Sequence, residues 1–151
     1  MIHDSQLTTK TGILIVNLGT PDAPTRPAVY RYLKQFLLDP RVIDINPIAR
    51  NLLVRGIIAP FRSGKSAKAY QEVWTENGSP LKFYGERLVE QVRQLLGTEY
   101  VVELAMRYQS PSIESAIKKL MQAKVSKIKV FTLFPQYASA TTGSVHEEVM
   151  R

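Results

Sequence analysis

Three apolar runs, separated by amphipathic stretches, dominate the pattern of the chain. The first, GILIVNL at residues 12–18, is continuously apolar and rich in β-branched residues. This predicts a strand that is covered on both faces, as in a parallel sheet. The runs YVVELAM at 100–106 and KIKVFTLF at 127–134 predict two further strands. Turn residues or prolines follow each run, so the sequence predicts three separate strands.

Between these strands, apolar residues recur at spacings of three and four, which is the pattern of amphipathic helices. A first helix is predicted from Pro27 to just before Asp39, with an apolar stripe of Val29, Tyr30, Leu33, Phe36 and Leu37. Further helices are predicted over 47–58, 63–75, 81–96 and 112–123, and a last one begins at 141. The stripe of the helix at 81–96 consists of Leu81, Tyr84, Leu88, Val92 and Leu95.

Strands that alternate with helices indicate an α/β domain with an open, mainly parallel sheet flanked by helices and joined by right-handed crossovers. We expect residues 12–151 to form this domain and the polar residues 1–11 to be a flexible tail. The last helix reaches Arg151 without a glycine stop, and three strands make a small sheet. We therefore expect the domain to be truncated within its last helix, as the first part of a longer protein.

Composition excludes several classes of protein. With 44% hydrophobic and 22% charged residues, the chain has the composition of an ordinary globular protein, which excludes a disordered one. It has no cysteine, which excludes disulfides, thiolate zinc sites and iron–sulfur clusters within this chain. No apolar run approaches the roughly 20 residues of a membrane helix, and the N-terminus lacks the apolar core of a signal peptide. These features predict a cytoplasmic protein.

The positive charge is concentrated in one segment. The net charge is +7, and residues 26–68 alone carry nine basic and two acidic residues. This segment is either a solvated helical face or lies near something anionic. Only the charge supports the hypothesis of nucleic-acid binding, because the Lys and Arg residues are not interleaved with aromatic residues and no helix-turn-helix motif is visible. We therefore expect no nucleic-acid partner.

An apolar stretch from Ile48 to Phe61 lies inside this basic segment and is flanked by arginines. Two interpretations stay open. The stretch packs into the core, or it forms a hydrophobic lip or a membrane-surface patch. On the second interpretation, residues 48–61 are the candidate for peripheral membrane contact.

Candidate binding residues follow all three strands. In an open α/β sheet, ligands bind beyond the carboxyl ends of the strands, and here those ends carry LGTP at 18–21, MRY at 106–108 and FPQY at 134–137. Two tyrosines, an arginine and a glutamine among apolar neighbours suit a large, flat, partly anionic ligand. The alternative is that Tyr108 and Tyr137 are packing aromatics and that Arg107 pairs with an acid.

Three apparent motifs carry no chemistry. The glycines near the first strand do not form a GxGxxG fingerprint, and RSGKS at 62–66 has no strand leading into it, unlike a P-loop. The segment HEEVM at 146–150 places Met150 where a zinc-protease helix needs its second histidine. With two histidines far apart and no cysteine, we expect no metal site within this chain.

Five motifs occur in a fixed order: GILIVNLGTPD at 12–22, YLKQFL at 32–37, GSPL at 78–81, MRY at 106–108 and FPQYASATTG at 134–143. In this order they resemble the amino-terminal half of ferrochelatase, and the resemblance runs from Lys10 to the end of the chain. It implies an enzyme of heme biosynthesis that inserts Fe²⁺ into protoporphyrin IX, releases two pyrrole protons and forms protoheme. Iron and porphyrin are the substrates, so no cofactor is expected.

The resemblance also implies a fold and a site. Ferrochelatases have two similar Rossmann-like, chelatase-type lobes with the porphyrin in the cleft between them, and this chain would be the first lobe. By position, the porphyrin-binding residues would be Leu18, Thr20, Tyr30, Leu33, Phe36, Leu37, Ser79, Arg107, Tyr108, Gln136 and Tyr137. Leu18, Leu33, Phe36 and Leu37 would form the apolar wall, while Ser79, Arg107, Tyr108 and Tyr137 would offer polar contacts around the macrocycle and its propionates. Residues 43–61 would form the lip.

Two departures from the family pattern matter. Relatives that metallate coproporphyrin have Tyr directly before the Gly-Thr-Pro turn, where this chain has Leu18, which favours protoporphyrin. The catalytic His and its partner Glu lie in the second half of the family, beyond Arg151, and His146 does not match that His. We therefore expect no catalytic residue in this chain, the missing carboxyl-terminal half as its partner, and no activity of the chain alone. The alternative is a non-catalytic α/β module that binds a flat anionic ligand such as a porphyrin.

Overall fold

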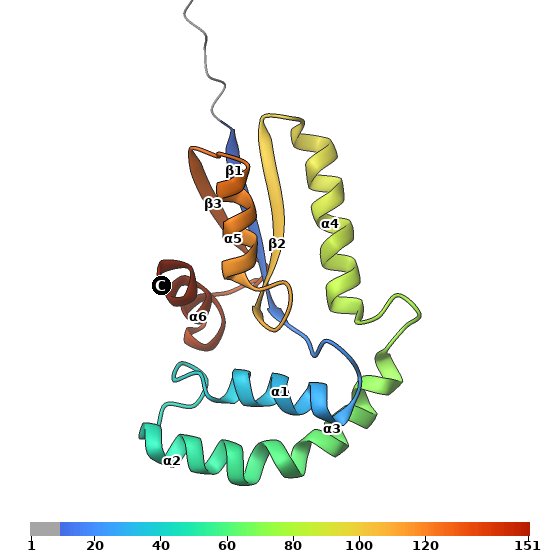
Figure 1. Cartoon of the computed structure of the whole chain (residues 1–151), viewed down its shortest axis with the longest axis vertical. Coiled ribbons are helices and arrows are strands. Elements are labelled where there is room, and N and C mark those ends of the chain that lie inside the picture. The colour runs from blue at the N-terminus through green and yellow to red at the C-terminus, as the bar shows by residue number, and fades with distance from the viewer. Residues whose placement is uncertain (1–9) are drawn as a thin grey trace, which may run out of the picture.

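The computed structural model describes residues 10–151, and its centre is one parallel sheet (Figure 1). The strands are β1 (Thr11–Gly19), β2 (Tyr100–Tyr108) and β3 (Lys127–Thr132), in the order β2-β1-β3. The continuously apolar β1 takes the central position, where both of its faces and both of its edges are covered. The predicted α/β class with an open parallel sheet is confirmed.

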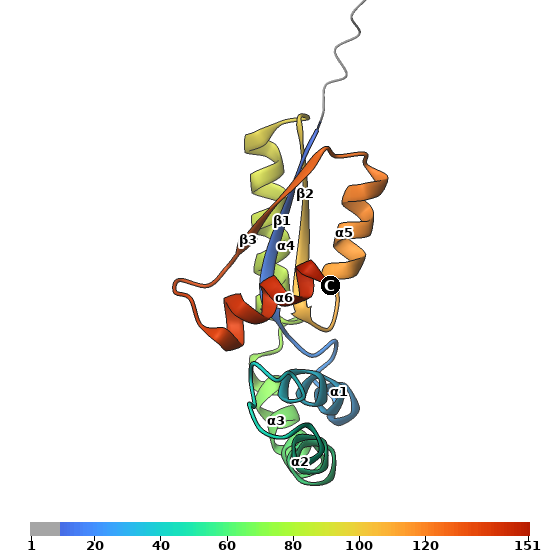
Figure 2. The same cartoon turned by 90° about the vertical axis from the view of Figure 1, so that its left-hand side faces the viewer.

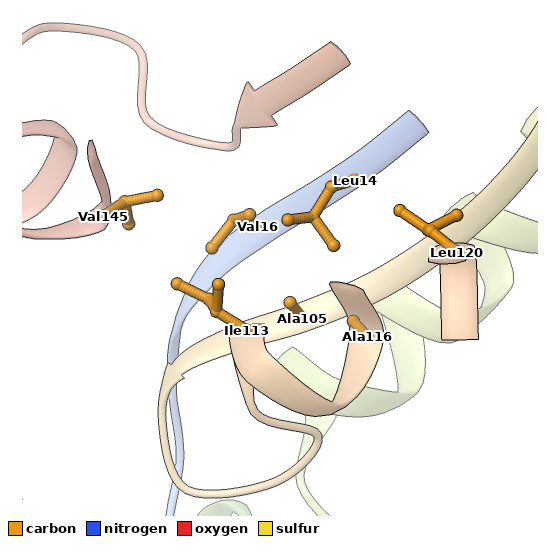
Figure 3. Packing of buried hydrophobic residues seen from close by; sticks show 7 residues of the cluster. All are labelled: Leu14, Val16, Ala105, Ile113, Ala116, Leu120 and Val145. Atoms are coloured by element: carbon orange, nitrogen blue, oxygen red, sulfur yellow. The ribbon is translucent and has the colours of Figure 1, made fainter. Parts of the chain in front are cut away.

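Helices cover both faces of this sheet (Figure 2). Helix α4 (Pro80–Leu96) packs on one face, while α5 (Ile113–Gln122) and α6 (Ser144–Met150) lie on the other. On the α4 side the buried core consists of Ile13, Ile15, Val89, Val102, Leu104 and Met106. On the other side it consists of Leu14, Val16, Ala105, Ile113, Ala116, Leu120 and Val145 (Figure 3). Each large side chain buried here stabilises the fold by about 1.5–3 kcal/mol relative to exposure.

A separate layer of helices lies beyond the carboxyl ends of the strands (Figure 1). It contains α1 (Arg26–Leu37), α2 (Pro47–Leu52), the π-helical segment η1 (Leu53–Ile58) and α3 (Ala59–Val73). Asn46 caps α2, because its side-chain oxygen accepts hydrogen bonds from the next two free backbone N–H groups. Helices α1 and α3 pack side by side through an aromatic pair, Tyr32 and Tyr70, whose centroids lie 6.3 Å apart.

The prediction of two separate helices over 47–58 and 63–75 is wrong. The chain is continuously helical from 47 to 73, with the wider π-type turn in the middle. Pro60 has no N–H to donate to the preceding turn, and a π-type turn directly before it accommodates the missing bond without ending the helix.

The predicted apolar stripe of α4 is wrong in part. Leu81, Tyr84 and Leu95 are exposed, whereas the helix buries Gly85 and Val89. A Cβ atom at Gly85 would lie 3.2 Å from Leu104, so the glycine sets the face on which the helix approaches the sheet most closely.

Element boundaries shift by a few residues from those predicted. Strand β2 runs on through Arg107 and Tyr108, which were expected in the following loop, and β3 ends at Thr132, two residues early. The helix expected from 141 divides into a second π-helical segment, η2 (Ser139–Gly143), and α6. Of the predicted tail, residues 1–9 lie outside the described residues. None of the helices within 10–151 is both long enough and apolar enough to cross a membrane.

Candidate functional site

The three segments expected to meet at one edge of the sheet do so. Gly19, at the end of β1, lies opposite Tyr108 at the end of β2, and Leu133 beyond β3 donates its N–H to Val16 O at 2.8 Å. Gly19 has φ +115, a conformation that glycine adopts readily and other residues avoid. This bend directs the chain out of the sheet and into the helical layer.

Helix α1 lies across this edge and carries several of the expected porphyrin-binding residues. Tyr30, Leu33, Phe36 and Leu37 are all half-buried, as is Leu18 at the end of β1. Burial on this helix is deepest at Ala28, Val29 and Tyr32. Of the predicted stripe only Val29 lies on this core face, and its other members stay partly accessible.

Aromatic rings tie α1 to β2. The Phe36 ring stacks on Tyr32 at 6.0 Å and meets Tyr108 edge-on at 5.2 Å between centroids. Such pairs stabilise a packing by about 0.5–1.5 kcal/mol beyond the area they bury. Burial raises the pKa of Tyr32 and of Tyr108 well above its ordinary value, so both phenols stay protonated at any physiological pH.

Thr20 and Ser79 form a second point of contact between distant segments. The Ser79 hydroxyl donates to Thr20 Oγ1 at 2.9 Å, and both side chains are buried. This bond joins the turn after β1 to the residue that precedes α4, 59 positions later. Both residues line a hollow of about 260 Å³ whose wall also includes Trp74 and Lys82. The hydroxyls therefore lie beside a polar recess at the same edge.

Arg107 and Tyr108 point into the interior of the chain. The Tyr108 hydroxyl donates to Asp39 Oδ2 at 2.8 Å, and the Arg107 guanidinium donates to the same oxygen at 2.8 Å. Tyr108 is completely buried, and Arg107 lies over its ring at 4.7 Å. Both groups are thus paired within the chain, as the alternative interpretation holds, and a contact of either with a ligand stays a prediction.

The loop that carries Gln136 and Tyr137 is open to solvent. Tyr137 is 71% exposed and lines a hollow of about 510 Å³ together with Arg41, His146 and Glu147. Arg41 and Glu147 form an ion pair across this hollow. Gln136 is exposed as well. Of the expected polar contacts, these two are the most accessible in the described chain.

The apolar stretch within the basic segment is not a core element. Four of its large apolar residues are exposed on α2, η1 and the start of α3; they are Ile48, Leu52, Ile57 and Phe61, between 57% and 79% exposed. Val54 and Ala59, on the opposite side, are buried against the rest of the layer. Core packing is therefore wrong for the outward residues, which lie among the exposed Arg55 and Arg62.

Sequence reasoning missed two residues of the site, Asp39 and Ser144. Both are buried, and the Ser144 hydroxyl donates to Asp39 Oδ2 at 2.5 Å. Burial opposes ionisation of Asp39, but the hydrogen bonds from Ser144, from the Arg41 backbone and from Tyr108, with the charge of Arg107, outweigh it and lower the pKa of the carboxyl. The one available signal was that Asp39 is one of only two acidic residues in the basic segment 26–68.

The arrangement is suited to binding. It combines an accessible aromatic side chain, half-buried apolar residues on α1, a polar recess at Thr20 and Ser79 and a second hollow at Tyr137. Residues 10–151 contain no group of three or more His, Asp or Glu side chains placed to hold a metal ion.

Comparison with known proteins identifies the family of the chain. The profile of the Ferrochelatase family matches residues 10–151. The ferrochelatase of Coxiella burnetii (strain RSA 493 / Nine Mile phase I) is 52% identical over 140 residues, which cover 93% of this chain and 40% of that protein. Those of Hamiltonella defensa and of Escherichia coli O9:H4 are 51% and 50% identical, and each is covered over 44% of its length. The chain thus spans less than half the length of these relatives, and it belongs to the ferrochelatase family.

Proposed function

We propose that this chain is the amino-terminal part of a ferrochelatase that inserts Fe²⁺ into protoporphyrin IX to form protoheme. The observation that carries the proposal is the family match over residues 10–151. Three of the five motifs lie at the ends of the three parallel strands, which meet at one edge of the sheet. Fe²⁺ and the porphyrin are substrates, and the proposal includes no cofactor.

In this proposal the chain supplies the residues on one side of the porphyrin site. Leu18, Leu33, Phe36 and Leu37 contact the apolar macrocycle, since all four are half-buried beside the strand ends and keep part of their surface accessible. The basic helical layer next to them attracts the carboxylates of the porphyrin. Leu18 offers no hydroxyl before the Gly-Thr-Pro turn, which favours protoporphyrin over coproporphyrin.

The remaining polar contacts come from both ends of this wall. Thr20 and Ser79 line one recess, and Tyr137, which follows Gln136 on the open loop, lines the other. Tyr30 is a further contact, half-buried on α1, and together with Arg107 and Tyr108 it completes the set that the family resemblance suggests.

The partner we propose is the carboxyl-terminal half of the same enzyme, which provides the proton acceptor. The uncovered side of β3 supports this. Phe131 lies opposite Ile15 in the sheet, on the face that α4 covers for β1 and β2, yet it is 53% exposed. Leu133, just beyond, lines an apolar hollow of about 370 Å³ with Leu81 and Tyr84. An apolar face of this kind is normally covered in the complete protein.

A second candidate function is non-catalytic binding of a porphyrin or another flat anion. The same exposed groups favour it, because binding needs only the wall that this chain supplies. We also propose peripheral membrane contact through residues 48–61, since their outward apolar residues lie among arginines, as in interfacial helices.

A chimera tests the proposed activity. The chain replaces the matching amino-terminal portion of the Coxiella burnetii ferrochelatase, and insertion of Zn²⁺ into protoporphyrin IX is followed by fluorescence. We expect the chimera to metallate the porphyrin and the isolated chain to show no insertion above the protein-free rate, because the proton acceptor that we propose belongs to the carboxyl-terminal half.

The controls separate the two candidate functions. A folded chimera without activity contradicts the enzymatic proposal, and if the isolated chain still quenches porphyrin fluorescence, the binding module is favoured. Measurable insertion by the isolated chain contradicts the claim that the second half is required.

A further inference from the structure

A buried carboxylate collects hydrogen bonds from three separate parts of the chain. Asp39 lies in the turn after α1 and is 7% exposed. Its Oδ2 accepts from Arg107 Nη2, from the Tyr108 hydroxyl and from the Ser144 hydroxyl, at 2.8, 2.8 and 2.5 Å. Its Oδ1 accepts from the backbone N–H of Arg41 at 2.8 Å. All these bonds depend on one side chain.

The donors are far apart in sequence. Arg107 and Tyr108 end β2, 68 and 69 positions after Asp39, and Ser144 begins α6, 105 positions after it. Arg107 Nε also donates to Ser144 Oγ at 2.6 Å, and its Nη1 lies 3.4 Å from Glu148. The network is therefore closed, because Arg107 and Ser144 each contact two or more other members. A closed, satisfied polar network has little freedom to change its geometry.

Stability alone does not explain such a network. Burying an ion pair costs desolvation, and well-packed apolar residues of similar volume often stabilise a protein as much or more. What a satisfied network adds is a fixed arrangement of the elements that it joins. Here those elements are the end of α1, the end of β2 and the start of α6.

Each of these elements carries part of the candidate site. Helix α1 holds Leu33 and Phe36, and the edge contact between Phe36 and Tyr108 lies beside the network. Helix α6 follows the loop with Gln136 and Tyr137 after the short segment η2, and the Arg41–Glu147 ion pair lies on the wall of the hollow that Tyr137 lines. A change at Asp39 therefore shifts the apolar wall relative to the open loop.

We propose that Asp39 is a positioning residue for ligand binding, whose carboxylate sets the spacing between α1 and the Gln136–Tyr137 loop by acting through Arg107, Tyr108 and Ser144. The inference rests on the proposed function for its ligand, a porphyrin, but the spacing itself is a property of this chain. Asp39 does not contact the ligand in this proposal.

The first test uses the isolated chain and does not depend on activity. Asp39→Asn keeps the size of the side chain but replaces one accepting oxygen by an amide that cannot accept. Amide hydrogen exchange is measured by mass spectrometry on the unaltered chain, on Asp39→Asn and on Glu90→Gln, which removes an exposed carboxylate on α4. We expect exchange at residues 38–46 and 136–150 to rise at least tenfold in Asp39→Asn alone, while β1 stays protected. Unchanged protection in these two segments overturns the proposal.

The second test uses the active chimera. We expect Asp39→Asn to raise the KM for protoporphyrin about tenfold and to change kcat less than twofold, with Glu90→Gln unchanged, since positioning affects binding more than the chemical step. A fall in kcat with an unchanged KM overturns the proposal. If Asp39→Asn does not fold, Tyr108→Phe removes only one donor and should raise KM about threefold, and an unaltered KM then overturns it. An inactive unaltered chimera counts against the proposed function, and hydrogen exchange still decides the role of Asp39.

Discussion

Replacement of Gly19 by alanine, which adds a single methyl group, should strongly lower the stability of the fold. Its φ of +115 is one that L side chains rarely adopt, and a Cβ atom there would lie 2.0 Å from Tyr108 O, about 1 Å closer than real Cβ atoms approach. The obstacle is backbone, and it cannot withdraw, because Tyr108 is paired with Gly19 in the sheet and its hydroxyl is bonded to Asp39. Moving β2 would therefore disrupt the edge that carries the site.

The expected magnitude combines two costs. A left-handed conformation costs an L residue about 1–2 kcal/mol, and forcing extra atoms into a packed position costs about 1–3 kcal/mol. Gly19→Ala should therefore lower the free energy of unfolding by about 2–5 kcal/mol, a large part of the roughly 5–15 kcal/mol of a typical domain. Urea denaturation followed by circular dichroism measures this change.

Gly56→Ala is the matched control. This glycine lies in η1 and has no positive φ, and a Cβ atom added there would meet no other atom within 4 Å. The same substitution there should raise the free energy of unfolding by about 0.5–1 kcal/mol, because alanine loses less backbone entropy in a helix. If Gly19→Ala costs less than about 1 kcal/mol under the same conditions, the contact between β1 and β2 is not rigid and the reasoning is refuted.

Two further predictions concern the lip and the buried carboxylate. The chain should bind vesicles that contain an anionic phospholipid in a sedimentation assay. The double variant Ile48→Ser, Phe61→Ser should bind at least tenfold more weakly, because it loses two exposed apolar side chains. If the unaltered chain does not bind the vesicles, the proposed membrane contact is refuted. Because folding lowers the pKa of Asp39 below its ordinary 3.8, its contribution to stability is present above that value and is lost as the pH falls below it. The free energy of unfolding should therefore drop less steeply from about pH 5 to about pH 3 in Asp39→Asn than in the unaltered chain, and equal slopes would refute this.

Local pattern was sufficient for much of the fold. An apolar run such as GILIVNL can be buried only if both of its faces are covered, so the packing of helices on both faces of β1 could be predicted from its composition. The face of α4 could not be predicted in this way. Helical spacing makes Leu81, Tyr84 and Leu95 a consistent stripe, but the closest approach to the sheet is made by Gly85, whose advantage is the absence of a side chain.

The candidate site likewise could be predicted from the sequence only in part. That the ends of the three strands meet follows from parallel topology, which the alternation of elements predicts. The pairing of Asp39 with Arg107, Tyr108 and Ser144 does not, because contacts across 68 to 105 residues leave no periodic signal in one sequence. For the same reason the loop position assigned to Arg107 was wrong, since a charged residue within a strand becomes plausible only when its buried partner is known.

The distribution of charge now bears on the choice between ligands. The nine basic residues of 26–68 lie on α1, on the turn after it and on the continuous helix from Pro47 to Val73. Within the described residues 10–151, Arg41 is the only one of these nine that forms an ion pair. A layer with so many unpaired positive charges repels itself, and an anionic ligand nearby relieves that repulsion. The same layer exposes Ile48, Leu52 and Phe61. A nucleic acid backbone would satisfy the charge but offers no apolar surface to cover those side chains, whereas a porphyrin with its carboxylates or an anionic lipid surface satisfies both.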